Sequence, residues 1–506
     1  MSWEMTELEQ QRLQKLERLQ SQGIDPFPHR TERTHTAADA VAALESSADD
    51  GEPAVTVCGR LRSLRTMGKI AFAHIEDGSG RVQLFFRADQ LGKPAIKSLE
   101  RDFDLGDFVQ AAGIMMRTRT GEPSVQVESF KMLAKAISPL PVVKEQEVDG
   151  ELIRYSAFAD VEERFRQRYA DLASNPEVRK VFRTRARVIS ALRQFMDQEG
   201  FLEVETPILQ PIYGGAAARP FVTMHEQLHQ DLYLRISFEL YLKRLLVGMY
   251  DRVYEIGRDF RNEGVSFKHN PEFTQLEFYA AYIDYYGVMD LTERMVAHVA
   301  EKLTGSTTIE YQGNSIDLAP PWDRVTLREA IKERAGIDYA EHSTAESLAA
   351  AMREKGHQPN PKSSWGKLVD SLLGTHVEPH LIQPTFILDY PRDISPLAKA
   401  KPDDPTHVER FEYFVAGMEM GNAFTEINDP LDQEQRFQEM GRLYDADDDD
   451  AHPMDHDYLR AMRYGMPPNG GFGTGVDRLV MLFSDKHTIR EVLLFPHLRS
   501  RDLGSS

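Results

Sequence analysis

Two segments more than 200 residues apart each place one arginine where a predicted strand ends. In the first, Phe260-Arg261-Asn262-Glu263, period-two geometry puts Arg261 and Glu263 on one strand face and the phenylalanine on the other. In the second, Gly471 to Gly475, closely spaced glycines end a strand and a helix follows. Arg478 then falls in the first helical turn, where backbone N–H groups favour anions. Together the two arginines indicate a polyphosphate site.

Each segment also has an ordinary explanation, since the first could form a surface salt bridge and the second a tight turn. Neither has the spacing of a Walker loop or a dinucleotide-binding fingerprint. A third segment lies upstream of both, Gly200-Phe201-Leu202-Glu203-Val204-Glu205-Thr206-Pro207. In this order the three segments resemble motifs 1, 2 and 3 of the class II aminoacyl-tRNA synthetases. The resemblance implies an antiparallel β-sheet catalytic domain flanked by helices, and a homodimer formed through motif 1.

Composition favours a large protein of a reducing compartment. A chain of 506 residues is expected to hold more than one domain, and 41% hydrophobic content is ample for a buried core. The single cysteine, Cys58, excludes an internal disulfide framework, so we expect a cytoplasmic location. We expect neither secretion nor membrane insertion. The net charge of −20 means that any nucleic acid must be bound by a localised basic face.

Three parts are expected along the chain, which gives an α+β multidomain fold. Residues 1–50 hold an N-terminal helix, from about Thr6 to Gln22, and a linker. Residues 51–150 contain short strands separated by turn residues such as Asp77-Gly78-Ser79-Gly80, which is typical of a small Greek-key β-barrel. Residues 151–506 form the catalytic domain, with a helical insertion at about 326–384.

Within the class, the chain resembles the bacterial lysyl-tRNA synthetases of subclass IIb from near Leu13 to its end. The segments that carry this resemblance are Gln210 to Phe221, Glu239 to Arg244 and His269 to Thr274. It implies a lysine–tRNA ligase, which uses ATP to convert L-lysine to lysyl-adenylate and transfers lysine to the 3′-terminal adenosine of tRNA(Lys). AMP and diphosphate are the other products. The chain departs from the family at Ser237-Phe238, where Ala-Pro is usual.

A lysine pocket needs a carboxylate because the substrate side chain ends in an ammonium. Strand alternation puts Glu277 and Tyr279 on one face, and it also aligns Asn422, Phe424 and Glu426. Glu277 alone is better explained by a structural salt bridge, whereas the family match favours Glu426 as the ammonium partner. The resemblance implies the remaining contacts to lysine, which are a hydroxyl from Tyr279, an apolar wall from Phe424, a donor to the carboxylate from Asn422, and α-amino contacts from Gly215 and Glu239.

A metal site is predicted where two strands are joined at Ala416-Gly417. In a two-residue hairpin Phe414 faces Glu419, which leaves Glu412 on the same side as Glu419. The two carboxylates suit Mg²⁺, and the family uses the matching glutamates in this way. Simple alternation would turn Asn422 to the other face, so we predict a bulge or twist near Gly421.

The resemblance also implies the ATP contacts. Arg261 and Arg478 are the catalytic arginines: the first neutralises the lysine carboxylate and the α-phosphate, and the second stabilises diphosphate. Phe273 resembles the residue that stacks on adenine and Glu263 the one that reads the adenine edge. His269 and Asn270 lie near the phosphates and base. For His269, which lies in a loop, contact with a phosphate is a simpler role than that of a general base.

The predicted barrel could be purely structural, a dimer brace or an oligonucleotide-binding surface. Phe72 can stack on a splayed base, and Gln83 offers both a donor and an acceptor to a base edge. Taken by itself, a phenylalanine in the position of Phe72 is more often part of a hydrophobic core. The resemblance implies that Phe72, Gln83 and Glu122 contact the anticodon of a transfer RNA.

Two rival functions remain open. A tRNA-independent adenylating enzyme would keep the lysine and ATP sites but would not need Phe72 and Gln83. A catalytically dead binding protein would be expected to lack at least one of Arg261, Arg478, Glu412 or Glu419, and all four are present.

Overall fold

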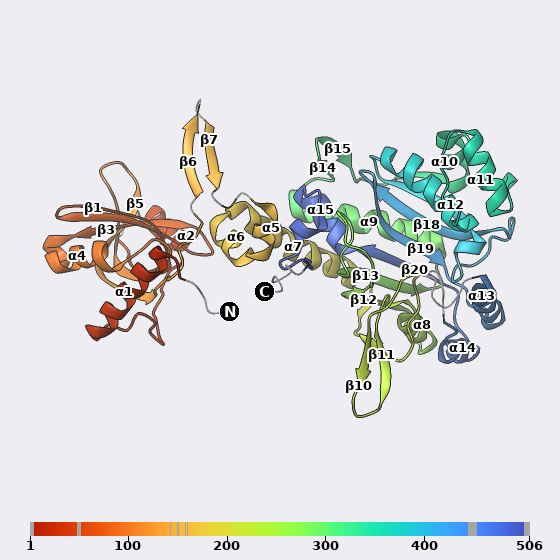
Figure 1. The fold of residues 1–506 in the computed structure, drawn as a ribbon, viewed down its shortest axis with the longest axis horizontal. Coiled ribbons are helices and arrows are strands. Elements are labelled where there is room, and N and C mark those ends of the chain that lie inside the picture. Colours follow the sequence, from red (N-terminus) through yellow and green to blue (C-terminus); the bar gives the residue numbers. More distant parts are fainter. Residues whose placement is uncertain are drawn as a thin grey trace, which may run out of the picture. The chain divides into compact units, whose positions relative to one another are not determined.

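The computed structural model describes residues 5–47, 52–141, 143–148, 151–156, 158, 160–443 and 453–499. The chain divides into two units, Met1–Asp160 and Val161–Ser506. Figure 1 labels the helices and strands of both. Among the described residues, no helix combines the length and the apolar character needed to cross a membrane.

The first unit is built on a closed barrel with the strand order β1-β2-β3-β5-β4. Its strands are β1 (Ala54–Met67), β2 (Ile70–Glu76), β3 (Arg81–Arg87), β4 (Phe108–Arg117) and β5 (Pro123–Ala134). Alternate residues point inward, so Ala71, Ala73 and Ile75 of β2 are buried while their neighbours are partly exposed. The barrel predicted from the strand and turn pattern is therefore confirmed.

Short helices and one hairpin complete this unit. The N-terminal helix α1 (Glu7–Ser21) starts at a capping box in which Thr6 and Glu9 bond to each other's backbone N–H groups. The other elements are α2 (Ala37–Ser46), α3 (Ala88–Leu91), α4 (Lys93–Asp102), β6 (Val143–Val148) and β7 (Glu151–Ser156). The predicted N-terminal helix is present with nearly the expected bounds.

The second unit contains an eight-stranded sheet with the order β16-β17-β18-β19-β20-β13-β12-β8. Only the outer pairs β16–β17 and β12–β8 are parallel, so the sheet is mainly antiparallel, as predicted. Its strands are β8 (Leu202–Glu203), β12 (Arg252–Phe260), β13 (Glu272–Ala281), β16 (Asp323–Thr326), β17 (Thr385–Pro391), β18 (His407–Val415), β19 (Met418–Thr425) and β20 (Asn469–Gly475).

Three helices cover one face of this sheet. They are α7 (Pro176–Gln198), α9 (Tyr285–Thr304) and α15 (Val476–Ser484), and they share one core with the inward residues of β13, Leu276 and Phe278. The opposite face of β13 carries Glu277 and Tyr279, as the alternation predicts. The largest core therefore occupies one side of the sheet, whereas smaller apolar clusters share the other side with polar groups.

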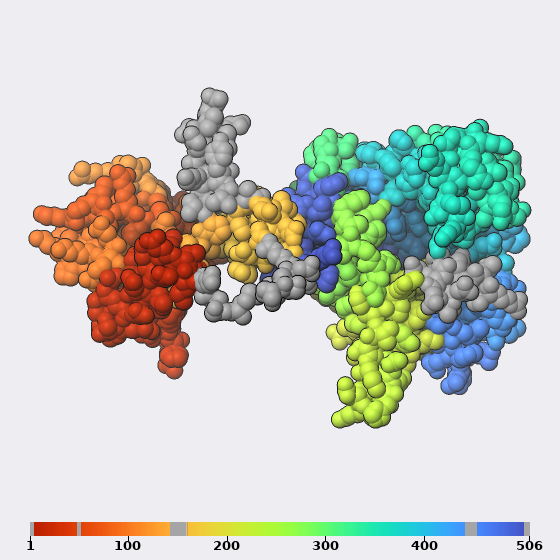
Figure 2. Space-filling view, in the orientation of Figure 1, coloured from red at the N-terminus to blue at the C-terminus, as the bar shows by residue number. Residues whose placement is uncertain are grey.

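Smaller elements surround the sheet. Residues 327–380 form a helical cluster with its own core, which is turquoise in Figures 1 and 2. Its elements are α10 (Leu327–Ala335), η1 (Tyr339–Glu341), α11 (Ala345–Glu354), α12 (Trp365–Leu372), η2 (Leu373–Val377) and η3 (Glu378–His380). The remaining elements are α5 (Val161–Arg166), α6 (Arg168–Ser174), β9 (Leu209–Gln210), β10 (Val222–His225), β11 (Gln230–Leu234), α8 (Glu239–Val247), β14 (Thr308–Tyr311), β15 (Asn314–Asp317), η4 (Arg392–Ile394), α13 (Pro430–Leu443), α14 (His456–Arg463) and α16 (Ile489–Val492).

The β10–β11 hairpin projects from the surface of this unit (Figure 2). Its apolar side chains are unusually open to solvent, with Val222 58%, Met224 54% and Leu228 67% exposed. Such a group of exposed apolar residues is typical of a surface that binds another protein.

One strand is shorter than predicted. β12 ends at Phe260, where it pairs with Glu272, the first residue of β13. A loop follows in which the Arg261 N–H donates to Pro271 (2.8 Å) and the Glu263 N–H donates to the carbonyl of Arg261 (2.9 Å). The expected strand position of Glu263 is therefore wrong, because the partner strand has already turned away.

The bulge predicted near Gly421 is present. Ala416 and Gly417, both with positive φ, form the tight turn, and Phe414 pairs with Glu419 as expected. The next pair is Tyr413 with Gly421, so Met420 is the extra residue of a β-bulge.

Candidate active site

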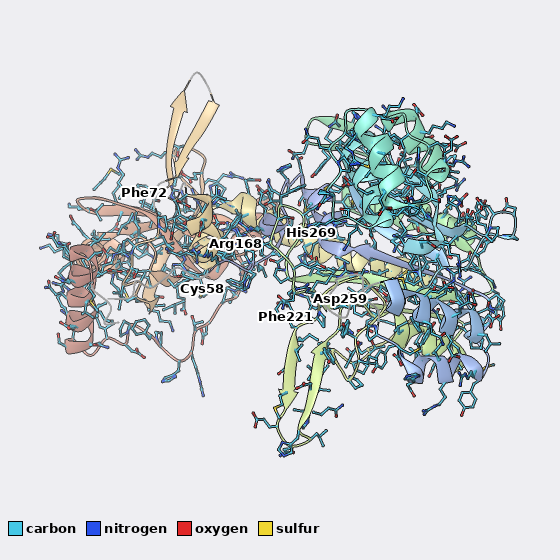
Figure 3. All side chains as sticks on the ribbon, turned by 45° about the vertical axis from the view of Figure 1, so that its right-hand side comes forward. Cys58, Phe72, Arg168, Phe221, Asp259 and His269 are labelled. Carbon is cyan, nitrogen blue, oxygen red and sulfur yellow. The ribbon has the colours of Figure 1, made fainter. Side chains whose placement is uncertain are left out.

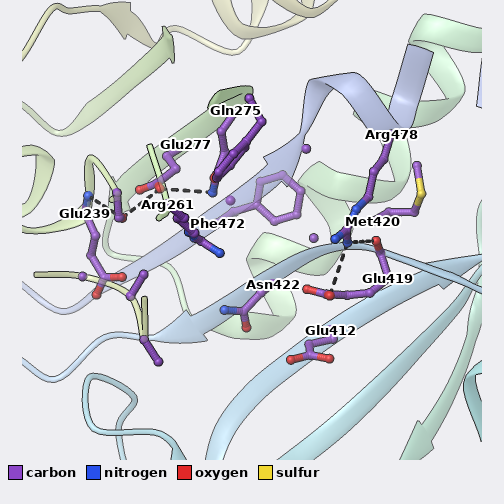
Figure 4. Close-up of a pocket in the computed structure, with 18 of the residues that line it drawn as sticks. Glu239, Arg261, Gln275, Glu277, Glu412, Glu419, Met420, Asn422, Phe472 and Arg478 are labelled. Atoms are coloured by element: carbon purple, nitrogen blue, oxygen red, sulfur yellow. Dashed lines mark hydrogen bonds and ion pairs between the residues drawn. The ribbon is translucent and has the colours of Figure 1, made fainter. Parts of the chain in front are cut away.

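A cavity of about 360 Å³ lies on the polar face of the large sheet, above β13, β19 and β20. Figure 4 shows two charged groups in it, with Arg261 and Asn422 between them in this view. Glu239 and Glu277 form one group, whereas Glu412, Glu419 and Arg478 form the other. Apart from Glu426, every catalytic-domain residue predicted for the ATP, lysine and metal sites lines this cavity.

The two predicted catalytic arginines reach the cavity from different elements. Arg261 follows β12, donates to the carbonyl oxygen of Ile236 (3.4 and 3.5 Å), and lies over the ring of Phe273 at 5.1 Å. Arg478 lies in the first turn of α15, and its Nη1 donates to the backbone oxygen and the carboxylate of Glu419. The two positive charges therefore face one enclosed space.

The residues predicted to bind ATP come from the loop after β12 and from the start of β13. Asn270 is only 7% exposed and is fixed, because its amide donates to the carbonyl of Glu272 (2.5 Å) and accepts from the N–H of His497 (3.3 Å). Burial, Arg478 and Lys268 lower the pKa of His269 to about 4. His269 is therefore neutral at pH 7 and meets a phosphate as a hydrogen-bonding partner rather than as a cation.

Glu412 and Glu419 form a strained pair of like charges. Burial and the charge of Glu419 raise the pKa of Glu412 to about 7, although Arg410 donates to it at 2.6 Å. Burial alone would raise the pKa of Glu419, but Arg478 lowers it below the usual value. In the described parts of the chain, no group of three or more His, Cys, Asp or Glu side chains is arranged for a metal. The pair nevertheless fits Mg²⁺, whose other ligands would be water and phosphate oxygens.

The acidic end of the cavity is tightly hydrogen-bonded. Glu277 accepts from Ser237 (2.9 Å), Gln275 (3.1 Å) and Tyr279 (3.3 Å). Burial, together with nearby carboxylates that include Glu239, raises the pKa of Glu277 well above its usual value. Ser237, which departs from the usual family pattern, therefore fixes a carboxylate that faces the substrate space.

Two predicted residues lie along β19 on the same side. Asn422 accepts from Nε of Arg410 (3.2 Å), which directs its amide nitrogen to serve as a donor. The guanidinium of Arg410 also lies 5.8 Å from the ring centroid of Phe424. Arg410 was missed by the sequence analysis, since no spacing rule connects it with Asn422 across the bulged hairpin.

Glu426 does not line the cavity and is completely buried. Its Oε2 contacts Nζ of Lys243, which also lies 2.5 Å from Oε1 of Glu239. Gly471 lines the cavity directly above Glu426, since a methyl group on Gly471 would overlap Oε1 of Glu426 and the ring of Tyr279. Lys243 was missed, although its place four residues after Glu239 on a helix was a usable signal.

Asp259 is a second buried residue that the sequence analysis missed (Figure 3). It has no solvent exposure and lies 3.4 Å from Nε of Arg235. Burial raises its pKa to about 7, against the lowering effect of Arg235 and Arg261. Its position on β12, two residues before Arg261, places it behind the catalytic arginine.

The three residues predicted for the anticodon gather on one outer face of the barrel. Phe72, labelled in Figure 3, stacks on Phe85 with the ring centroids 4.8 Å apart. Gln83 is more enclosed than predicted: its amide donates to Glu122 (2.6 Å) and accepts from Ser124 (2.7 Å). It is only 8% exposed because the loop that carries Glu122 covers it. A base would have to compete with these bonds.

Comparisons with known proteins agree with this geometry. Residues 160–499 match the family of class II tRNA synthetases (D, K and N), and residues 55–133 match an OB-fold nucleic acid binding domain. A lysine–tRNA ligase of Roseiflexus castenholzii is 55% identical over 99% of this chain and 100% of its own length. A lysine–tRNA ligase of Chloroflexus aurantiacus is 51% identical over 98% of this chain and 99% of its own length. One of Moorella thermoacetica is 50% identical over 97% of both chains.

Proposed function

The chain belongs to the class II tRNA synthetases, and from this we propose that it is a lysine–tRNA ligase. It activates L-lysine with ATP and then transfers the lysyl group to the 3′-terminal adenosine of tRNA(Lys). The observation that carries the proposal is the position of Arg261 between the acidic end of the cavity and the group of Glu412, Glu419 and Arg478.

In the first step an oxygen of the lysine carboxylate attacks the α-phosphorus of ATP, and the bond to the β-phosphate breaks. Two anions must approach each other, and the place of Arg261 in the cavity lining supports its role in neutralising both. Arg478 stabilises the departing diphosphate. Lysyl-adenylate remains in the cavity.

Glu412 and Glu419 would hold Mg²⁺, which supplies positive charge to the phosphate oxygens when it is bound. Phe273 offers its ring to adenine and Glu263 offers hydrogen bonds to its edge. The neutral ring of His269, 3.5 Å from Arg478, is placed to bond a phosphate oxygen beside that arginine.

In the second step the terminal ribose hydroxyl of tRNA attacks the carbonyl carbon of the adenylate, and AMP leaves. The barrel supports a role for tRNA, because its family match is to a nucleic acid binding domain and Phe72 presents a stacked aromatic pair on the outer face. The tRNA-independent rival has no use for this surface.

We place the enzyme in the cytoplasm and expect it to be a homodimer. The exposed apolar residues of the β10–β11 hairpin, together with Leu202 of motif 1 and Leu209 of β9, support this assembly. Sedimentation at low protein concentration tests it, and a fully active monomer would argue against it.

The activity is tested by lysine-dependent ATP–pyrophosphate exchange followed by charging of a tRNA(Lys) transcript. The proposal predicts both reactions. Exchange without charging would favour the tRNA-independent rival, and the absence of exchange would favour the dead binding protein.

A further inference from the structure

A lysine of the protein itself lies buried behind the acidic end of the cavity, where it pairs with Glu239, which lines the cavity. Nζ of Lys243 lies between the carboxylates of Glu239 and Glu426, and its side chain has no solvent exposure. Glu239 and Glu426 are also buried, at 4% and 0% exposure. The three groups form a continuous row that runs from the predicted α-amino site to the predicted side-chain ammonium site.

Packing alone does not explain this row. Oε2 of Glu426 contacts Nζ of Lys243, whereas Oε1 has no hydrogen-bond partner among the described atoms. A buried charge that is left so poorly bonded is costly unless a ligand completes it. Oε1 of Glu426, the oxygen turned away from Lys243, lies beneath Gly471 and Tyr279, and both of these residues line the cavity.

The charges suggest which ligand completes the row. A bound ammonium favours the ionised form of a carboxyl, and in that form Glu239, Glu277 and Glu426 bring three negative charges to this end of the cavity, while Lys243 brings one positive charge. Two negative charges are then left over. A free lysine molecule carries two ammonium groups, and its carboxylate can pair with Arg261. The occupied site is neutral only with Lys243 in place.

We propose that Lys243 is a positioning and specificity residue, whose resident ammonium holds Glu239 and Glu426 in register and makes the pocket select an amino acid with two ammonium groups. This inference rests on the proposed activation of lysine. It adds that the selectivity for lysine depends on the charge of Lys243, a residue that does not itself contact the substrate.

Removal of the Lys243 ammonium would change the ionisation of the groups around it. Glu239 and Glu426 face Lys243 directly, and Tyr279 and Tyr458 approach it from β13 and α14. Without the ammonium, three carboxylates would face two substrate charges, and one of them would take up a proton. Glu426 is the candidate, because burial raises the pKa of this carboxyl and Lys243, which opposes that rise, would be gone. A protonated Glu426 no longer favours an ammonium over a methyl group.

The test uses K243M, which keeps a long apolar side chain without the charge, and K243Q as a second neutral variant. K332M serves as the matched control, because Lys332 is 62% exposed and forms an ion pair with Asp338. Pyrophosphate exchange is measured with lysine and with norleucine, which lacks the terminal ammonium, and thermal unfolding is followed in parallel. Wild-type exchange with lysine establishes the proposed function separately from this inference.

We expect both neutral variants to raise KM for lysine at least about tenfold, to leave KM for ATP within about threefold, and to reduce the preference for lysine over norleucine. The pH above which lysine binds tightly should also move upward in both variants, because loss of the Lys243 ammonium raises the pKa of Glu426. The inference is overturned if KM for lysine is unchanged, or if lysine and ATP are affected equally with a lowered unfolding temperature. K332M should match the wild type.

Discussion

Arg478 donates from one guanidinium nitrogen to both the backbone oxygen and the carboxylate of Glu419. This bond connects the first turn of α15 to the bulged strand β19, so the predicted diphosphate ligand and the predicted metal ligand are fixed to each other. A substrate phosphate that enters here meets a cation and a carboxylate already in position, which is the preorganisation that charge-stabilising sites require.

Replacement of this arginine should affect the chemical step more than binding. We expect R478K to lower kcat for pyrophosphate exchange by about 10²-fold, because the lysine ammonium lacks the planar fork of N–H donors that fixes the guanidinium between Glu419 and a phosphate. KM for lysine should change little. Exchange kinetics with each substrate varied in turn measure both values. R353K is a suitable control, because Arg353 is an exposed residue of α11 that does not line the cavity.

The Mg²⁺ requirement should depend on pH. The raised pKa of Glu412, about 7 before metal binds, means that this carboxyl is largely protonated at pH 6 and ionised at pH 8. Because Mg²⁺ binds the ionised form, the concentration needed for half-maximal exchange should fall as pH rises through 7. E412Q should remove most of this dependence and reduce exchange. An unchanged pH dependence in E412Q would place the titrating group elsewhere.

Gly471 should be intolerant of any side chain. A methyl group there would overlap Oε1 of Glu426 and the ring of Tyr279, which leaves no room at the end of the lysine site. We expect G471A to raise KM for lysine more than about tenfold with little effect on ATP. Gly80 offers a control, because a methyl group on it would meet no atom within 4 Å. Normal lysine binding by G471A would place the ammonium site elsewhere.

The barrel surface should matter for charging alone. Phe72 stacks on Phe85 on the outer face, where loss of base stacking costs about 1–3 kcal/mol. F72A should therefore lower kcat/KM for tRNA charging by roughly 5- to 150-fold and leave pyrophosphate exchange at the wild-type rate. A parallel loss of both reactions would indicate a structural role for Phe72.

Local patterns in the sequence predicted most elements that build the site. Alternation along β13 separated Glu277 and Tyr279 from the main core. The need to place both Glu419 and Asn422 on one face predicted a bulge near Gly421, and the structure has it at Met420. These features depend on neighbouring residues and on period-two geometry, which a sequence contains directly.

Features that depend on distant packing were not predictable. Lys243 was missed, because its burial depends on the approach of Glu426, which follows β19 and lies far away in the sequence. Gln83 was expected to be available to a base, but Glu122 and Ser124 already bond it. The end of β12 at Phe260 likewise depends on where its partner strand begins.

The most direct test of the account is pyrophosphate exchange by the wild-type enzyme with lysine, aspartate and asparagine supplied one at a time, since the class II family that matches this chain covers all three. The three buried carboxylates and Lys243 predict exchange with lysine alone. Exchange with aspartate or asparagine in place of lysine would contradict the charge logic of the pocket and the function proposed from it.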